Sequence, residues 1–159
     1  MNTGRIEIIY GDGGKTAMAL GKGLVAAANQ KDVVVIRFLK GGQMPEGMEV
    51  VRRLEPEMSV FCFEKSSCDF AHLPKEARQE EQLNILNAFH YARKVLTTGE
   101  CDMLILDGAL GLLDQGILLE QELIKLLESR SGTDVLLTGK TLPQGLASMA
   151  DQIEKVSRA

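Results

Sequence analysis

A lysine and a threonine follow a cluster of glycines near the start of the chain, in the segment YGDGGKTAM from Tyr10 to Met18. A glycine loop that runs into a helix can point several backbone N–H groups at a phosphate, with the positive end of the helix dipole behind them. Lys15 would add a full positive charge, and Thr16 could offer its hydroxyl to Mg²⁺. The residues predicted to contact a nucleotide here are Gly11, Asp12, Gly13, Gly14, Lys15, Thr16 and Ala17.

This loop is shorter than the general phosphate loop. The pattern G-x-x-x-x-G-K-[ST] places a glycine five positions before Gly14, where this chain has Ile9, and Gly11 lies only three positions before Gly14. Glycines between a strand and a helix often form only a turn, so a plain turn is the alternative interpretation. A preceding strand, a following helix and a distant strand that ends in aspartate favour phosphate binding.

Two more segments place polar residues directly after apolar strands. Asp107 follows the run MLIL, and Thr138, Gly139 and Lys140 follow the run DVLL. Ligands of open α/β sheets bind outside the carboxyl ends of the strands, and P-loop proteins use an acidic residue there near the metal. We therefore predict a metal site at Thr16 and Asp107, with Thr138, Gly139 and Lys140 completing the nucleotide site. The predicted catalytic residues are Lys15, Thr16 and Asp107.

Strand and helix patterns alternate along the chain, which predicts a three-layer α/β fold with a mainly parallel sheet, like that of P-loop NTPases. Residues 41–74 are broken by glycines and prolines and are expected to form loops around one strand. The expected strands are Arg5–Tyr10, Asp32–Leu39, Val60–Phe63, Met103–Leu106, Asp134–Leu137 and an edge strand, Gln152–Val156. The expected helices begin near Thr16, Pro74, Leu119 and Pro143.

Composition limits the class of protein. The 159 residues are 45% hydrophobic, which suits one domain over residues 1–159. The net charge is -4 and the 18 lysines and arginines form no basic stripe, so nucleic acid is not expected as a partner. No apolar run approaches the roughly 18 residues of a membrane span and no signal peptide is evident, so a cytoplasmic protein is expected. Three cysteines without a metal or CxxC spacing predict reduced, structural thiols.

Some single residues have simpler interpretations than a ligand role. Arg37 could face a substrate group or an acidic neighbour, and an ion pair with Asp107 is favoured. Glutamates 76, 80 and 81 are expected to be the solvated first turn of a helix. Methionines 44, 48 and 58 are expected to fill gaps in the packing, with a site for a large apolar macrocycle as the alternative.

Nearly the whole chain resembles the P-loop type ATP:corrinoid adenosyltransferases of cobalamin biosynthesis and salvage. That family's loop is similar to Gly-Asp/Asn-Gly-Lys-Gly-Lys-Thr-Thr, and residues 11–17 are one residue shorter still. The segments VVVIRFLKG, CDMLILD, GILLEQELIKLLESR, LLTGK and LPQGLASMAD follow the family's order. The last two are the most specific, because they resemble its Leu-Thr-Gly-Arg, Pro and Ala-Asp signature.

The resemblance implies transfer of the 5′-deoxyadenosyl group of ATP to Co(I) of a corrinoid, with triphosphate as leaving group. It also implies Mg²⁺ as a cofactor and a homodimer with the corrinoid near the subunit boundary. Catalysis would consist of alignment and of stabilising the departing triphosphate. Phe70 is the residue that best matches the family's corrinoid-facing aromatics.

Three departures fall on residues that carry the chemistry. The loop is short, Asp107-Gly108 stands where the family has Asp-Glu, and the chain contains no tryptophan. A non-catalytic nucleotide- or corrinoid-binding paralogue is therefore the alternative to the enzyme. A small-molecule kinase is disfavoured, because no arginine-rich lid lies between the last two helices.

Overall fold

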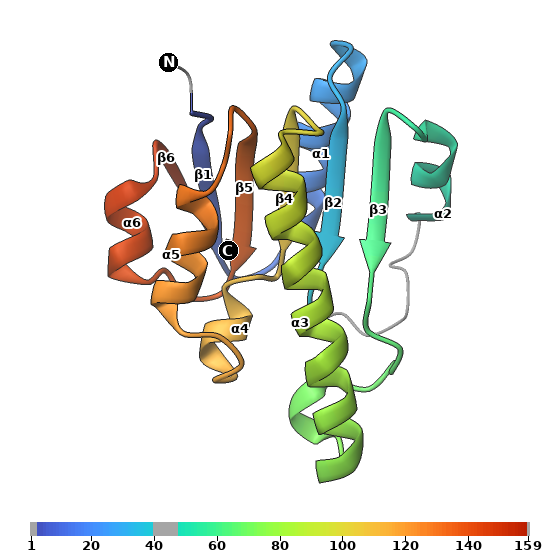
Figure 1. Cartoon of the computed structure of the whole chain (residues 1–159), viewed down its shortest axis with the longest axis vertical. Helices are drawn as coiled ribbons and strands as arrows, with labels where there is room; N and C mark the ends of the chain where they lie inside the picture. Colours follow the sequence, from blue (N-terminus) through green and yellow to red (C-terminus); the bar gives the residue numbers. More distant parts are fainter. Residues whose placement is uncertain (1–2, 40–47, 159) are drawn as a thin grey trace.

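The computed structural model describes residues 3–39 and 48–158. Its centre is a six-stranded sheet in the order β3-β2-β4-β5-β1-β6, and every pairing recorded between these strands is parallel. Figure 1 shows the strands side by side with their carboxyl ends pointing the same way. The strands are β1 Ile6–Gly11, β2 Val33–Arg37, β3 Met58–Cys62, β4 Met103–Asp107, β5 Asp134–Gly139 and β6 Gln152–Val156.

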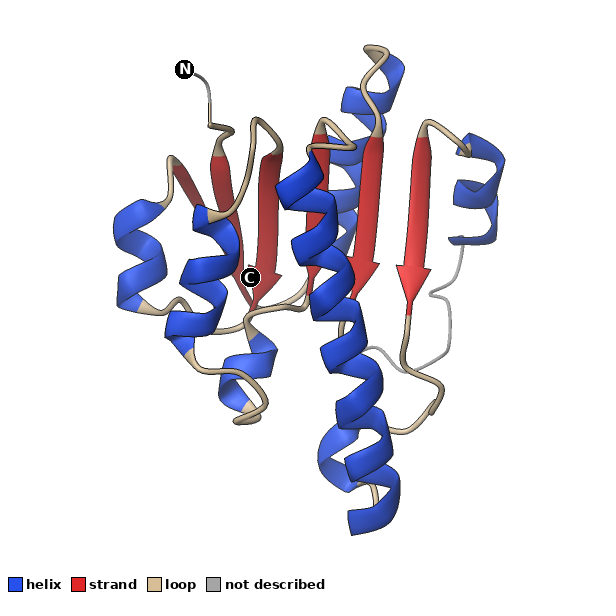
Figure 2. Ribbon diagram, viewed as in Figure 1, coloured by secondary structure: helices blue, strands red, loops and turns tan. Residues whose placement is uncertain are grey.

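Helices cover both faces of this sheet, which makes three layers. Helix α1 (Lys15–Ala28) lies behind the sheet, and α3 (Lys75–Thr98), α5 (Glu120–Glu128) and α6 (Gln144–Met149) lie in front of it (Figure 2). Helix α3 begins beyond the carboxyl ends of the strands, runs back along the sheet and stops at Gly99, whose φ of 65° suits a glycine. The predicted α/β fold class is confirmed.

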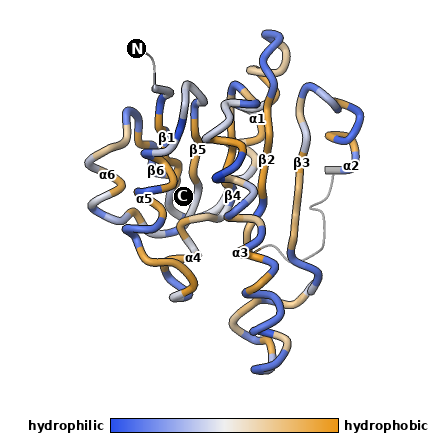
Figure 3. Tube along the Cα trace, viewed as in Figure 1, coloured by the Kyte–Doolittle hydropathy of each residue, from blue (hydrophilic) through white to orange (hydrophobic). Residues whose placement is uncertain are grey.

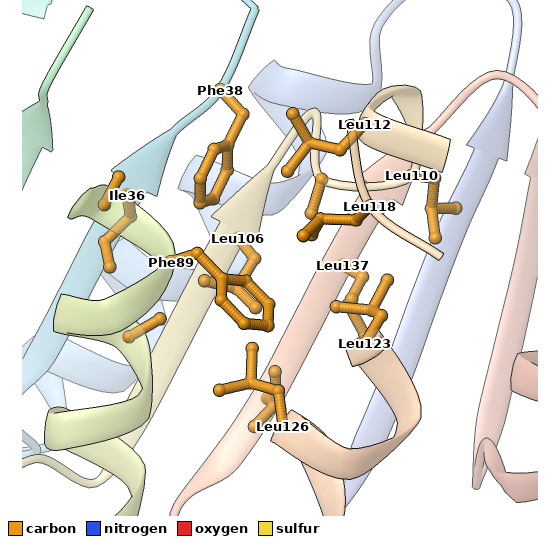
Figure 4. Packing of buried hydrophobic residues seen from close by; sticks show 14 of the residues in the cluster. Ile36, Phe38, Phe89, Leu106, Leu110, Leu112, Leu118, Leu123, Leu126 and Leu137 are labelled. Carbon is orange, nitrogen blue, oxygen red and sulfur yellow. The ribbon is translucent and has the colours of Figure 1, made fainter. Parts of the chain in front are cut away.

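The inner strands β2, β4 and β5 are buried because their sequences are mostly apolar on both faces. Figure 3 shows β2 in hydrophobic colours except at its carboxyl end, as expected of a strand covered on both sides. On the front face, Phe38, Phe89 and Leu106 belong to a large cluster built with leucines of α5 (Figure 4). On the α1 face, a smaller cluster holds Ala19 of α1 against Val35 and Ile105.

Most predicted elements are found within a few residues of their expected ends. The expectation of loops over residues 41–74 is wrong in part, because α2 (Met48–Val51) and 3₁₀ turns at Arg52–Leu54 and Phe70–His72 occur there. These elements and α4 (Gly111–Asp114) span at most four residues, too few to display a helical period. Lys40–Gly47, including Met44, lie outside the described residues, as does the side chain of Met48, whereas Met58 is buried in the core as predicted.

Register and alternation place three polar side chains on the α1 face. Successive side chains of a strand point to opposite faces, and Val35 and Ile105 pack on the α1 side. Arg37 and Asp107 each lie two residues further along and are paired in register. Thr138 of β5 is likewise two residues after Leu136 of the same cluster. The carboxyl ends of β2, β4 and β5 therefore present these side chains beneath the start of α1.

No helix among residues 3–39 and 48–158 is both long and apolar enough to cross a lipid bilayer.

Candidate nucleotide-binding site

The loop between β1 and α1 depends on three glycines. Gly11, Gly13 and Gly14 have φ angles of 119°, 72° and 72°, a region that side chains with a Cβ rarely adopt. Gly14 is also the N-terminal cap of α1. The amide of Asp12 donates to the carbonyl of Val156 at 2.9 Å, which ties the loop to the end of β6. The following amides belong to the first turn of α1, where a helix has no internal acceptor for them.

Lys15 folds back across this loop. Its ammonium group donates to the carbonyl oxygen of Gly11 at 2.6 Å, so the charge lies above the loop instead of extending into solvent. A phosphate seated at the start of α1 would meet this ammonium and the first-turn amides together. The structure thus brings the predicted loop residues and the predicted lysine into one place.

Asp107 is the centre of a buried hydrogen-bonding cluster. Its side chain is 1% exposed. The Thr16 hydroxyl donates to both carboxylate oxygens, at 3.0 Å to Oδ1 and 3.1 Å to Oδ2. The Thr138 hydroxyl donates to Oδ1 at 2.7 Å and accepts a hydrogen bond from the amide of Gly108, also at 2.7 Å. Asp107 therefore fastens the start of α1 to the ends of β4 and β5.

Arg37 completes this cluster from β2. Its Nε lies 3.5 Å from Oδ2 of Asp107, and the arginine side chain is only 3% exposed. The predicted ion pair is therefore confirmed. A buried pair of this kind is screened far less by water and salt than a surface pair.

A polar cavity of about 510 Å³ opens beside the loop. It is lined by Asp12, Gly13, Lys15, Lys140, Ser157 and Arg158. Three of these side chains are cationic and one is acidic, a balance that suits an anion. A methyl group built on Gly13 would overlap the Arg158 guanidinium, so this arginine lies directly over the loop.

Sequence reasoning missed Ser157 and Arg158. They follow β6, and the rule that ligands gather at the carboxyl ends of strands applies to that edge strand as well. The pairing of Gly11 with Val156 then carries residues 157–158 to the loop. A signal for these residues was thus present in the predicted strand Gln152–Val156.

Other predicted site residues lie less close to the loop. Gly139 packs against Leu110, whose Cγ would lie 2.9 Å from a Cβ built on this glycine, so backbone and side chain are in tight contact there. Ala17 is exposed in the first turn of α1. Phe70 lies in the 3₁₀ turn beside α3 and belongs to the front core with 8% of its surface exposed. The structure does not bring Phe70 to the phosphate loop, and its contact with a corrinoid stays a prediction.

The prediction of a solvated glutamate cluster is wrong for Glu81. This side chain is 6% exposed. Its carboxylate accepts from the amides of Lys65 and Ser66 at 3.0 and 3.1 Å and from Asn84 Nδ2 at 2.8 Å. Glu81 lies four residues before Ile85 on the buried face of α3, which is the signal that could have identified it. It holds the segment after β3 against that helix.

The three cysteines differ in their surroundings. Burial raises the pKa of Cys62, and it raises the pKa of Cys101 to about 12. Cys68 is exposed. None of the three is in a disulfide, as the sequence predicts.

A second cavity, of about 670 Å³, lies beside α1, where the helix meets residues of β1 and β4. Its walls are mostly aliphatic and include Met18, Val25 and Met103, with Glu7 and Lys22 among the residues around them. It contains none of the predicted site residues. The polar cavity at the loop, although smaller, is the one that coincides with the chemistry.

A parallel sheet with a glycine loop between β1 and α1, and with a threonine bonded to an aspartate at the end of β4, defines a P-loop type of nucleotide-binding α/β protein. The profile of one family, described as ATP:corrinoid adenosyltransferase BtuR/CobO/CobP, matches residues 2–159. The chain belongs to this family of transferases, whose substrates are ATP and a corrinoid.

Two further comparisons add little. A search of curated proteins gives no match. A solved structure titled as that of a DNA replication initiation factor is similar with a TM-score of 0.44 and 14% identity, covering 96% of this chain and 40% of that one. This chain therefore spans less than half the length of that structure, and the likeness supports no functional argument.

Proposed function

We propose that this chain is itself an active ATP:corrinoid adenosyltransferase. The observation that carries the proposal is that Lys15 lines a cation-rich cavity while the adjacent Thr16 is hydrogen-bonded to the buried Asp107, in a chain whose family performs this reaction. In the reaction, an electron pair of Co(I) attacks the 5′ carbon of ATP and forms the cobalt–carbon bond. The carbon–oxygen bond breaks, and its electron pair leaves with the triphosphate.

The residues of the loop act on the leaving group. The amides at the start of α1 and the ammonium of Lys15 hold the triphosphate and stabilise the charge that it gains as the bond breaks. Lys140 and Arg158 add positive charge from the rim of the cavity. Thr16 gives its only hydroxyl proton to Asp107, so its oxygen faces a ligand solely as an acceptor.

The remaining parts of the proposal are predictions from the sequence and from the resemblance to the family. They are a single domain over residues 1–159, a homodimer, a cytoplasmic location, Phe70 against the corrinoid, and contacts of Asp12, Ala17 and Gly139 with the nucleotide. Mg²⁺ at Thr16 and Asp107 also stays a prediction.

The test is to incubate the protein with ATP, Mg²⁺ and chemically reduced cobalamin and to follow the visible spectrum. Formation of adenosylcobalamin with release of triphosphate supports the proposal. Lys15→Ala should lower the rate by roughly 100-fold, because it removes a charge that contacts the leaving group. Lys31→Ala, an exposed lysine after α1, is the matched control and should leave the rate unchanged.

Two other outcomes separate the alternatives. ATP binding with an unchanged cobalamin spectrum would identify a non-catalytic binding paralogue. A phosphorylated product with ADP would identify a kinase. Either result contradicts the proposed transferase activity.

A further inference from the structure

The predicted metal site already contains a cation that belongs to the protein. Asp107 is 1% exposed and Arg37 is 3% exposed, and Nε of the arginine lies 3.5 Å from Oδ2 of the aspartate. Arg37 stands on β2 directly in register with Asp107 on β4. The strands therefore fix this ion pair in place beneath the phosphate loop, next to the Thr16 hydroxyl.

The hydrogen bonds of Asp107 use most of its capacity to accept. Each carboxylate oxygen has two lone pairs. Oδ1 accepts from the Thr138 hydroxyl, the single proton of Thr16 is shared between Oδ1 and Oδ2, and Oδ2 also faces Arg37. The next residue, Gly108, has no side chain to supply another oxygen.

These contacts do not fit a Mg²⁺ held directly by Asp107. Mg²⁺ requires close oxygen ligands in a near-ideal octahedron, and direct ligation would displace a hydroxyl from the carboxylate. It would also bring a double positive charge beside a guanidinium that is removed from solvent, where repulsion is weakly screened. The charge that would attract the metal is already balanced by Arg37.

We infer that Arg37 takes over the charge-balancing role of a divalent cation, so that the loop binds the polyphosphate chain of ATP without a requirement for Mg²⁺. The inference rests on the proposed function. A buried carboxylate below the loop repels a metal-free polyphosphate unless a cation neutralises it. Arg37 supplies that cation permanently, and Lys15, Lys140 and Arg158 provide the positive charge that meets the phosphates. Arg37 is thus a positioning residue that acts through Asp107.

The experiment is isothermal calorimetry of ATP binding to the full chain, in EDTA and in excess Mg²⁺. For the unmodified protein, the two dissociation constants should agree within about threefold. Arg37→Gln leaves the Asp107 charge uncompensated, so its affinity in EDTA should be at least about tenfold weaker than in Mg²⁺. Arg37→Lys restores a charge and should restore the metal-independent binding, which a merely structural role would not predict.

Controls keep the result interpretable. Arg52→Gln changes an exposed arginine in a 3₁₀ turn. Its ratio of the ATP dissociation constants in EDTA and in Mg²⁺ should equal that of the unmodified protein. Circular dichroism checks that each variant is folded. If Arg37→Gln does not fold, the ratio measured for the unmodified protein and for Arg37→Lys still decides the question.

The outcomes separate this inference from the proposed function. Tight binding of ATP that appears only with Mg²⁺ in the unmodified protein overturns the role of Arg37 and leaves the transferase proposal intact. If neither ATP nor inorganic tripolyphosphate binds in either condition, the proposed function fails and the inference fails with it.

Discussion

The two faces of the central sheet are built differently. The front face packs α3, α5 and α6 on a large cluster of buried apolar residues (Figure 4). The opposite face has a smaller cluster under α1, and several apolar side chains of that helix reach solvent, with Leu24 48% and Val25 62% exposed. The front face therefore contributes most of the hydrophobic stabilisation.

The α1 face carries the buried polar residues instead. Arg37, Asp107 and Thr138 are almost fully covered there, at the end of the sheet where α1 begins. Burying such groups is unfavourable unless they bond to one another, which is what the Asp107 cluster achieves. One face therefore mainly stabilises the fold, and the other carries the buried polar cluster beneath the proposed anion site.

The largest effect is expected on the front face. Phe89→Ala should lower the free energy of unfolding by about 3–5 kcal/mol, because it removes a ring that is 3% exposed and leaves a cavity. Urea denaturation measures this change. Leu83→Ala on the same helix is the control, since that side chain is 64% exposed and the loss should stay below about 0.5 kcal/mol. Equal losses for both variants would contradict the picture of a front-face core.

The next effect tests the polar cluster. Asp107→Asn keeps the size of the side chain but removes the negative charge beside a buried guanidinium, which should cost about 3 kcal/mol of stability. Thermal and urea unfolding both report the change. Asp114→Asn, at an exposed position after β4, should have almost no effect. If Asp107→Asn is as stable as the unmodified protein, the ion pair with Arg37 is not important for stability.

Two glycines of α1 probe its two sides. A Cβ on Gly23 would lie 2.8 Å from Cδ1 of Ile105 and 3.1 Å from Cε of Met58, whereas nothing lies within 4 Å of one on Gly21. Gly21→Ala should stabilise by about 0.5–1 kcal/mol through helix propensity. Gly23→Ala should be less stable than Gly21→Ala by about 1–3 kcal/mol through overpacking. Chemical denaturation of the pair would reveal the difference, and equal stabilities would mean that α1 is packed loosely on both sides.

The smallest effect concerns the ion pairs at the edge of the α1 face. Lys22 Nζ lies 3.0 Å from Glu154 Oε1, and this hydrogen bond lowers the pKa of Glu154. Glu154→Gln should cost less than about 1 kcal/mol at neutral pH. Because the folded-state pKa is lowered, the stabilisation exists above the ordinary glutamate pKa and disappears as the pH falls through the lowered value.

Unfolding curves recorded from neutral to acidic pH measure this difference. Glu128→Gln, an exposed residue of α5, provides the comparison. A difference between Glu154→Gln and the unmodified protein that grows as the pH falls would contradict the assignment.

Much of the site followed from local patterns. The hydrogen bonds from Thr16 to Asp107 join residues 91 positions apart, yet each residue was recognisable as the one that follows a strand or a glycine loop. Arg37 lies within its predicted strand, and an ion pair with an acidic neighbour such as Asp107 was favoured for it over contact with a substrate group. Glu81 was wrongly predicted to be exposed, because the prediction relied on its negative charge and not on its position on the apolar face of α3. Arg158 was missed because its importance depends on β6 lying next to β1.

The sequence by itself determined the order of strands and helices, the glycine loop and the class of ligand, because these are properties of short segments. Only the tertiary structure decided that β2, β4 and β5 are adjacent, and hence that Arg37, Asp107 and Thr138 share one buried cluster. The physical reason is that contacts between residues far apart in the chain depend on strand order and register, which no local period specifies. Those contacts also determine whether the Asp107 carboxylate still has lone pairs and charge available for a metal.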